Sequence, residues 1–202
     1  MRGIGDRTVD ADDKRELLLD AAERGFGRFG YAGTTMATLA AEAQVTRPTV
    51  YAYYDSKDEV FVALAERVRG EFLQLQERAD TSSPVEIIRS TLSANLDLFV
   101  RHYAILAVIA HQALSDDGMR ALHEDIYARV HRRHARFLQR MAASGHVRLP
   151  VPATSVAEAV TGIARRFAEQ AVAEPGRAAA LRQQLVDLYL RLTDLQDEPH
   201  AT

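Results

Sequence analysis

Apolar residues recur every three to four positions along most of the chain, and this spacing restricts the fold more than any other feature. One stripe consists of Leu18, Ala22, Phe26 and Phe29. A second consists of Val60, Leu64, Val68, Phe72 and Leu75. No segment shows sustained alternation of apolar and polar residues. Because a helix repeats every ~3.6 residues and a strand every ~2, the sequence predicts an all-α protein of about nine helices.

Composition limits the class of protein further. The 202 residues are 47% hydrophobic, which is enough apolar mass for a globular core. The chain has no Cys, so disulfides and thiolate metal sites are excluded. No apolar run approaches the ~18 residues of a membrane span, and the first residues lack the apolar core of a signal peptide. We therefore expect a cytoplasmic protein without a cofactor.

Glycine, proline and capping residues predict where the helices begin and end. Residues 1–12 are expected to form a flexible arm, and Gly30 to end the first helix in the left-handed conformation. Ser56 with Glu59, and Ser83 with Glu86, have the spacing of capping boxes. The predicted helices cover 13–29, 35–43, 47–53, a long segment after Ser56, 84–101, 103–114, 117–143, 154–173 and 177–195.

The two short helices at 35–43 and 47–53 are separated by three residues, Gln44-Val45-Thr46. Two helices joined by such a turn form a DNA-reading device when the second one can enter the major groove. Thr46 stands at the N-cap position, and Arg47 and Thr49 in the next turn offer a guanidinium suited to guanine and a methyl suited to thymine. This segment therefore predicts a helix-turn-helix.

Residues 15–61 resemble the N-terminal domain of the TetR family, the tetracycline-repressor-type regulators. The matching stretches are Leu18-Leu19-Asp20-Ala21-Ala22, Phe26, Gly30-Tyr31, Thr34-Thr35, Leu39-Ala40, Val45-Thr46, Thr49-Val50-Tyr51 and Tyr54-Asp55-Ser56-Lys57-Asp58. The resemblance implies phosphate contacts from Thr35, Thr46, Tyr51 and Lys57. It implies contacts to base edges from Arg47, Pro48, Thr49 and Tyr53.

This chain departs from the family pattern at three positions of the domain, and one of them, Pro48, stiffens the start of the second short helix. Gln44 stands where the family usually has Gly in the turn, and a positive φ there would cost Gln ~1 kcal/mol more than Gly. Gly25 replaces a large apolar residue, so loose packing of the first helix is expected. Residues 1–60 also carry eight Lys and Arg against eleven Asp and Glu. Affinity for DNA must therefore come from the placement of cations on one face.

By analogy with the family, residues 13–60 form the DNA-binding domain and residues 61–202 a helical domain that binds a small effector and dimerises. The effector pocket is predicted at Phe99, Tyr103, Leu106, Ile109, Tyr127 and Phe167. The last two helices carry wide apolar faces that would pack as a four-helix bundle across a twofold axis, with an internal hairpin core as the alternative. The predicted interface residues are Val160, Ile163, Phe167, Leu181, Leu185, Leu188 and Leu192.

The sequence thus favours a homodimeric repressor that binds a palindromic operator in double-stranded DNA and is released by a small-molecule effector. One alternative is a metal-responsive regulator, because His123, His131 and His134 share a helix face with Tyr127. Arg132 and Arg133 beside them indicate instead a solvated basic stripe. A helical enzyme is a further alternative, but no phosphate loop, nucleophile elbow or metalloprotease motif supports it.

Overall fold

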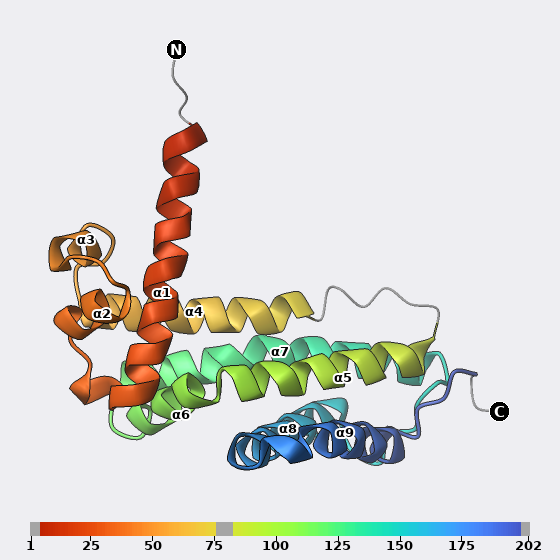
Figure 1. Ribbon diagram of the computed structural model, residues 1–202. Helices are drawn as coiled ribbons and strands as arrows, with labels where there is room; N and C mark the ends of the chain where they lie inside the picture. The colour runs from red at the N-terminus through yellow and green to blue at the C-terminus, as the bar shows by residue number, and fades with distance from the viewer. Residues whose placement is uncertain (1–4, 76–82, 199–202) are drawn as a thin grey trace. The chain divides into compact units, whose positions relative to one another are not determined.

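The computed structural model describes residues 5–75 and 83–198, with side chains from residue 11 onward. The described residues form α-helices and one short 3-10 turn, with no strand (Figure 1). The all-α prediction is confirmed. The elements are α1 (Gly5–Gly33), α2 (Met36–Glu42), α3 (Arg47–Tyr51), α4 (Lys57–Leu75), α5 (Pro84–Arg101), α6 (Tyr103–Gln112), α7 (Asp117–Ala143), α8 (Ala153–Ala173), η1 (Pro175–Arg177) and α9 (Ala178–Thr193).

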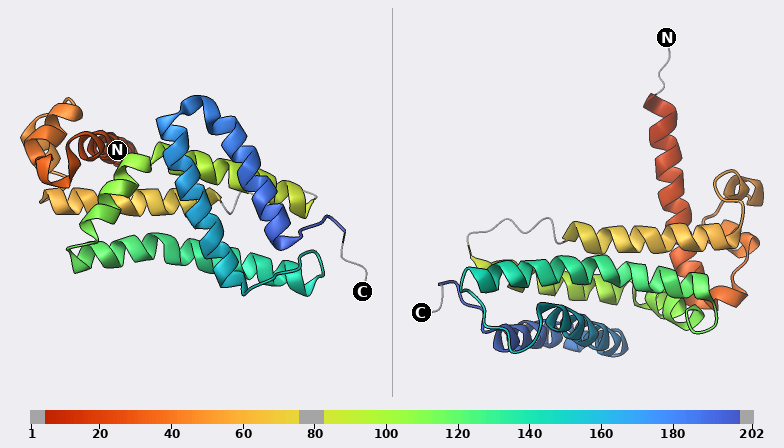
Figure 2. Two further views of the ribbon diagram at one scale, coloured as in Figure 1. Left: turned by 90° about the horizontal axis from the view of Figure 1, so that it is seen from below. Right: turned by 180° about the vertical axis from the view of Figure 1, so that it is seen from behind.

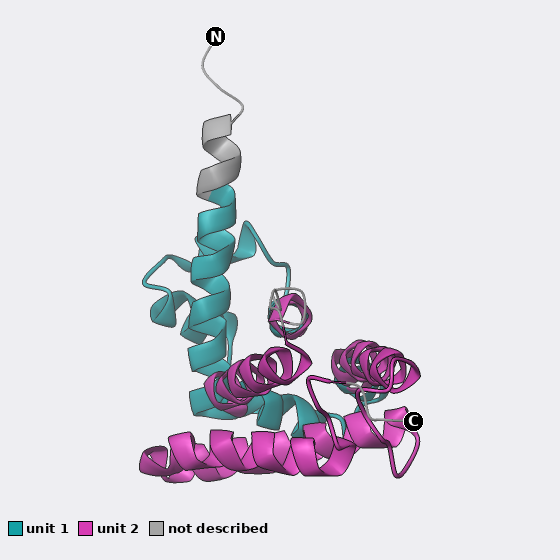
Figure 3. Ribbon diagram, turned by 90° about the vertical axis from the view of Figure 1, so that its right-hand side faces the viewer, with its two compact units in different colours: residues 1–68, 104–123 teal, residues 69–103, 124–202 magenta. Residues whose placement is uncertain are grey.

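The chain divides into two compact units, coloured separately in Figure 3. Unit 1 consists of residues 1–68 and 104–123, and unit 2 of residues 69–103 and 124–202. Unit 1 holds α1 to α3, the first part of α4, and most of α6. Helices α4 and α7 each contribute residues to both units.

Helix α1 is longer than the sequence analysis expected. It begins at Gly5, inside the segment 1–12 that was predicted to be a flexible arm. No proline or glycine interrupts the chain between Gly5 and Asp13, so backbone hydrogen bonding can continue through it. At the other end Gly30 has φ 68° and ψ 178° and kinks the helix, which resumes up to Gly33. The positive φ at Gly30 was predicted, but its ψ lies outside the left-handed helical region.

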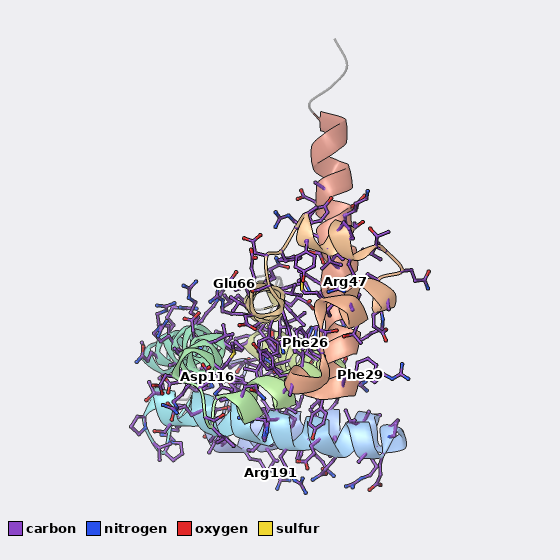
Figure 4. All side chains as sticks on the ribbon, turned by 90° about the vertical axis from the view of Figure 1, so that its left-hand side faces the viewer. Phe26, Phe29, Arg47, Glu66, Asp116 and Arg191 are labelled. Atoms are coloured by element: carbon purple, nitrogen blue, oxygen red, sulfur yellow. The ribbon has the colours of Figure 1, made fainter. Side chains whose placement is uncertain are left out.

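The core of unit 1 is an aromatic cluster. The ring of Phe26 on α1 meets Phe61 on α4 edge to face at 4.8 Å between centroids, and Tyr31 meets Phe61 in the same way at 4.9 Å. Phe26 is fully buried, whereas Phe29, the last residue of the predicted stripe, is 39% exposed (Figure 4). Phe29 directly precedes the kink at Gly30. The guanidinium of Arg28 lies over the Phe29 ring.

An ion-pair cluster also joins α1 to α4. The guanidinium of Arg67 bonds to Glu16, Asp20 and Glu23, with N–O distances of 3.2, 2.7 and 2.8 Å. The three carboxylates recur at i, i+4 and i+7 on one face of α1. Only 13% of the Arg67 side chain is exposed, so three of the acidic residues that make the N-terminal segment negative are held by this residue of α4.

The capping predictions hold in part. Ser56 accepts a hydrogen bond from the Glu59 amide at 3.1 Å, but the Glu59 carboxylate binds the amide of Asp55 rather than that of Ser56. Ser83 caps α5 by accepting from the Glu86 amide at 3.3 Å. The Asp197 carboxylate accepts hydrogen bonds from the Ser83 hydroxyl and from the Val85 amide, and these bonds lower the pKa of Asp197.

In unit 2, α8 and α9 form an antiparallel hairpin that packs on α5 (Figure 2). Pro175 and Gly176 form the turn between them, where the sequence analysis predicted the break. Arg182 on α9 bonds to Asp97 on α5 at 2.8 Å. No single helix among the described residues is long and apolar enough to span a membrane, although the bent pair α5 and α6 would qualify together on length and composition.

Candidate nucleic-acid interface and ligand cavity

The turn between α2 and α3 is closed by two backbone hydrogen bonds. The Val45 amide donates to the Ala40 carbonyl at 2.9 Å, and the Gln44 amide donates to the Ala41 carbonyl at 3.1 Å. This is the Schellman pattern of a helix C-terminus, in which the residue directly after the helix cap adopts the left-handed conformation. Gln44 does so, with φ 55°. The predicted positive φ at Gln44 is confirmed.

Close contact between α1 and α2 fixes where this turn lies, contrary to the loose packing expected at Gly25. Gly25 is buried, and a Cβ added to it would meet Leu39 Cδ2 at 3.4 Å. The buried hydroxyl of Thr34 lies within hydrogen-bond distance of the Gly25 carbonyl, at 3.2 Å, and of the Gly30 carbonyl, at 2.7 Å. A large side chain at Gly25 would displace α2, so the small residue fits the observed spacing.

The first turn of α3 points away from the core of its unit. Thr46, Arg47 and Pro48 are exposed, and Val50 behind them is buried. Thr46 is the N-cap: its hydroxyl accepts from the Thr49 amide at 3.4 Å and lies 2.8 Å from the Thr49 hydroxyl. Arg47, labelled in Figure 4, makes no side-chain hydrogen bond or ion pair with any residue that the structure describes. Its guanidinium is available to a ligand.

The other predicted DNA contacts surround this turn in different states. Thr35 is exposed and caps α2, sharing a hydrogen-bond box with Thr38, and Tyr51 is 47% exposed. Tyr53 is half-buried beneath the Arg15 guanidinium, which lies 5.8 Å from the ring centroid. Lys57 donates to the Tyr31 carbonyl at 3.0 Å and lies over the Tyr31 ring. Of these four, only Thr35 and Tyr51 stand fully on the surface.

Partners within unit 1 hold several acidic residues near the turn. Glu42 at the end of α2 pairs with Arg24 and Arg28 of α1, each at 3.7 Å. The carboxylate of Asp58 accepts a hydrogen bond from the Tyr31 hydroxyl. Burial together with this bond raises the pKa of Tyr31 above its ordinary range. Arg24 and Arg28 thus neutralise Glu42 locally, next to the turn.

Residues 18–64, which contain the turn and both short helices, match the family model described as bacterial regulatory proteins of the tetR family. These residues form a TetR-type DNA-binding domain. The resemblance stated from the sequence is therefore confirmed, and α2 and α3 are the helix-turn-helix of a TetR-type domain.

Known TetR-type proteins resemble the chain beyond this domain. The HTH-type transcriptional repressor NicS of Pseudomonas putida is 26% identical over 130 residues, which cover 63% of this chain and 58% of NicS. The chain spans about half the length of the curated relatives it matches.

Solved structures share the fold over nearly the whole chain. SmeT, the repressor of the Stenotrophomonas maltophilia multidrug efflux pump SmeDEF, superposes with a TM-score of 0.70 at 24% identity, covering 93% of each chain. A transcriptional regulator from Saccharomonospora viridis, solved in complex with choline, gives a TM-score of 0.72 at 18% identity, covering 90% of this chain and 98% of its own.

A cavity of about 290 Å³ lies between α5, α7 and α8 of unit 2. Apolar and polar side chains both line it. The lining residues are Ile87, Ile88, Thr91, Leu92, Asn95, Val130, Arg133, His134, Phe137, Arg140, Val160, Thr161 and Ala164. Mixed lining of this kind is typical of small-molecule sites.

None of the residues predicted for the effector pocket lines this cavity. Phe99 is buried between Phe72, at 4.7 Å, and Tyr127, at 6.5 Å between ring centroids, and Leu106 and Ile109 are buried. Tyr103 and Phe167 are half-buried outside the cavity. The prediction favoured large apolar residues, which fill a core as readily as they line a site. A better signal was available in the spacing of Val130, Arg133, Phe137 and Arg140, which puts two cations on a partly apolar helix face.

The histidines of α7 do not assemble a metal site. His134 Nε2 lies 2.9 Å from the Tyr189 hydroxyl, and the two rings stack. His131 stacks on Tyr127 instead. Among the described residues no group of three or more His, Asp or Glu side chains could hold a metal ion. The metal-responsive alternative is therefore unsupported, and of the expected basic stripe only Arg132 is exposed, while Arg133 is half-buried at the cavity.

The residues predicted for the dimer interface divide into two groups. Val160, Leu181 and Leu185 are buried within the chain, so their side chains pack against the chain's own helices, and their place in the interface stays a prediction. The period of the leucine stripe does not distinguish the inner face of the hairpin from the outer one. Leu188 is 45% exposed, and Ile163, Phe167 and Leu192 are half-buried.

Proposed function

We propose that the chain is a dimeric transcriptional repressor that binds a palindromic operator through α3 and releases it when a small molecule binds in unit 2. The observation that carries the proposal is the exposed first turn of α3, directly after a closed helix-turn-helix turn, with an Arg47 side chain that has no partner among the described residues. NicS and SmeT are both named as repressors, which supports repression rather than activation.

In this proposal the side chains of the leading turn recognise the operator. Arg47 pairs with a guanine edge in the major groove, and Pro48 and Thr49 contact neighbouring bases. Thr35, Thr46 and Tyr51 bind phosphates, since their hydroxyls are at the surface. Lys57 keeps two N–H groups beyond the one given to Tyr31, so it can bridge that carbonyl and a phosphate. Tyr53, covered by Arg15, contributes less than the resemblance implies.

Dimerisation is proposed through the outer face of the α8–α9 hairpin. Leu188 and Val172 are 45% and 43% exposed, and the half-buried Ile163, Phe167 and Leu192 extend the apolar surface. Two copies related by a twofold axis would bury this face. Their recognition helices would then enter successive major grooves about 34–36 Å apart.

The cavity of unit 2 supplies the effector site. Helix α4 contributes residues to both units, so a change in its position can reach the DNA-binding segment. An effector that binds the non-binding conformation more tightly shifts the population away from the operator. A nearly complete shift requires that the effector bind one conformation about 5.5 kcal/mol more tightly than the other.

Selection of bound sequences from a random double-stranded oligonucleotide pool tests the function directly. The expected result is a palindrome with half-site centres about 10 base pairs apart, or a multiple of that spacing. Arg47→Ala protein in parallel should recover a motif that is degenerate at one or two positions per half-site. Recovery of no enriched sequence would contradict the function, and a single asymmetric site would contradict the dimer.

A further inference from the structure

The charged groups that line the cavity all carry the same sign. Arg133 and Arg140 lie on α7 two turns apart, and no Asp or Glu is present among the described residues of the lining. Arg140 makes no ion pair or side-chain hydrogen bond with a described residue. Burial and the neighbouring His131 lower the pKa of His134 to about 4, so that ring is neutral near pH 7. Arg133 also donates to the Leu73 carbonyl at 3.5 Å. Among the described lining residues no carboxylate faces the two guanidiniums, so this part of the lining carries net positive charge.

Uncharged hydrogen-bonding groups lie on the helix that faces these cations. The Thr91 hydroxyl and the Asn95 amide, on α5, are half-buried and make no side-chain hydrogen bond within the described part of the chain. Half-buried polar groups without an internal partner are best satisfied by water or by a ligand. An acid group accepts hydrogen bonds from guanidinium, hydroxyl and amide alike.

The remaining wall is apolar and the volume is small. Ile88, Leu92 and Val160 are buried there, and Phe137 adds an aromatic face. About 290 Å³ is at the lower end of the range for ligand sites, which begins near ~300 Å³. A short aliphatic or single-ring body fits this space better than a large polycyclic one.

We infer that the effector is a small organic acid, whose acid group is held by Arg133 and Arg140 and whose apolar body lies against Ile88, Leu92 and Val160. This inference rests on the proposed function in treating the cavity as the effector site. It disfavours organic cations, because a cation would meet two guanidiniums and, among the described lining residues, no carboxylate.

Three probes with one carbon skeleton test the charge preference: phenylbutyrate, phenylbutyramide and phenylbutylamine, titrated calorimetrically into the full chain. Phenylbutyrate is expected to bind at least about tenfold more tightly than the amide, as charge-assisted hydrogen bonds predict, and the amine not at all. Octanoate and benzoate extend the acid series. Binding of the amine or the amide as tight as that of the acid, or no binding by any of the acids, would overturn the inference.

Two double variants test whether the guanidiniums of Arg133 and Arg140 cause the preference for the acid over the amide. The double variant Arg133→Gln/Arg140→Gln should bind acid and amide within about twofold of each other. The matched control is Arg132→Gln/Arg136→Gln, which removes the same charge from two positions of the same helix that do not line the cavity. It should keep the wild-type preference, and circular dichroism checks that both variants fold. A double cavity variant that keeps the full preference for the acid would contradict the assignment.

Release of the selected operator separates this inference from the proposed function. If the acid binds but leaves DNA affinity unchanged, the ligand class stands and the repressor mechanism fails. If the amine or another organic cation releases the operator while the acids do not, the repressor mechanism stands and the ligand class fails.

Discussion

The turn from Thr46 to Pro48 presents its side chains to solvent, whereas the polar side chains that line the cavity between α5, α7 and α8 are half-buried, apart from the exposed Arg140. The reading segment is organised by contacts between near neighbours, such as the Val45–Ala40 hydrogen bond and the Thr46–Thr49 cap. The cavity combines residues from Ile87 to Ala164 on three helices. A substitution on the reading surface should therefore change recognition at little cost in stability, while one in the cavity should change both.

Arg67 gives the strongest test of that contrast, because it joins α4 to α1 in the DNA-binding domain across more than forty residues of sequence. Arg67→Met removes the partner of Glu16, Asp20 and Glu23 and leaves three carboxylates on one face of α1. We expect a loss of about 2–3 kcal/mol in the free energy of unfolding, below the full value for a buried pair because Glu16 and Asp20 are largely exposed. Urea denaturation followed by circular dichroism measures it.

The control for this prediction is Arg24→Met, which removes an exposed pair with Glu42 in the same unit. Its expected cost is below ~1 kcal/mol. Equal losses for the two variants would show that Arg67 contributes no more than a surface charge, and that the reading domain is supported by its local contacts and aromatic core alone.

The pH dependence of stability tests the contribution of His134, which lines the cavity. Burial lowers its pKa to about 4, while the unfolded chain titrates near ~6.5. As pH falls below ~6.5 the unfolded state takes up the proton and the folded state does not, so stability declines until the folded pKa is reached. The wild type should lose about 2 kcal/mol between pH 7 and pH 5 through this group.

His134→Phe keeps an aromatic ring against Tyr189 and removes the titrating group, so its stability should change less over the same interval. The exposed His111→Phe serves as control and should follow the wild type. Urea midpoints at the two pH values give the comparison. An identical pH-dependent loss in His134→Phe and wild type would contradict the assignment to His134.

Arg47→Ala should have the next effect, confined to recognition. Loss of one guanidinium–guanine pair is expected to weaken binding to the selected operator by about 1–3 kcal/mol and binding to random DNA much less. The free energy of unfolding should stay within ~0.5 kcal/mol of wild type, since the Arg47 side chain has no partner in the part of the chain that the structure describes. Fluorescence anisotropy on both DNAs measures the ratio, and equal losses on the two would contradict a base-reading role.

The same contrast explains what could be predicted from the sequence. The bounds of α5 and α7 agree with the predicted helices 84–101 and 117–143, because apolar period and capping residues are local signals. The exposed turn at Arg47 followed from spacing within a few residues, and the positive φ at Gln44 followed from the resemblance to a family that usually has Gly there.

The cavity and the buried half of the predicted interface depend on which helices meet, and the sequence does not specify that. Leu185 and Leu188 belong to one stripe, yet the first is buried under the hairpin and the second is 45% exposed. Likewise Arg132 and Arg133 are adjacent in the sequence, but only Arg133 reaches the cavity. The helical repeat of apolar residues identifies an apolar face. It does not show whether that face packs within the chain or against a second copy.

Gln44→Gly should give the smallest change, and its sign is the opposite of the others. Gln44 is exposed and holds φ 55°, so its side chain stabilises nothing by burial while its Cβ strains the backbone. Relief of that strain gives ~1–2 kcal/mol, and the greater freedom of glycine in the unfolded chain takes back ~0.5–1 kcal/mol. We expect a net gain of about 0.5–1 kcal/mol in the free energy of unfolding.

The matched control is Ala41→Gly, three residues earlier in the regular part of α2, where glycine relieves no strain. It should lose ~1 kcal/mol, so the two glycine variants should shift the urea midpoint in opposite directions. A loss at both positions would mean that the left-handed residue is not strained in solution. Opposite signs would show that the helix-turn-helix stores a backbone cost at one exposed position, which contacts elsewhere in its unit must offset. The reading segment would then be local in its geometry while depending on the aromatic cluster and Arg67 for its stability.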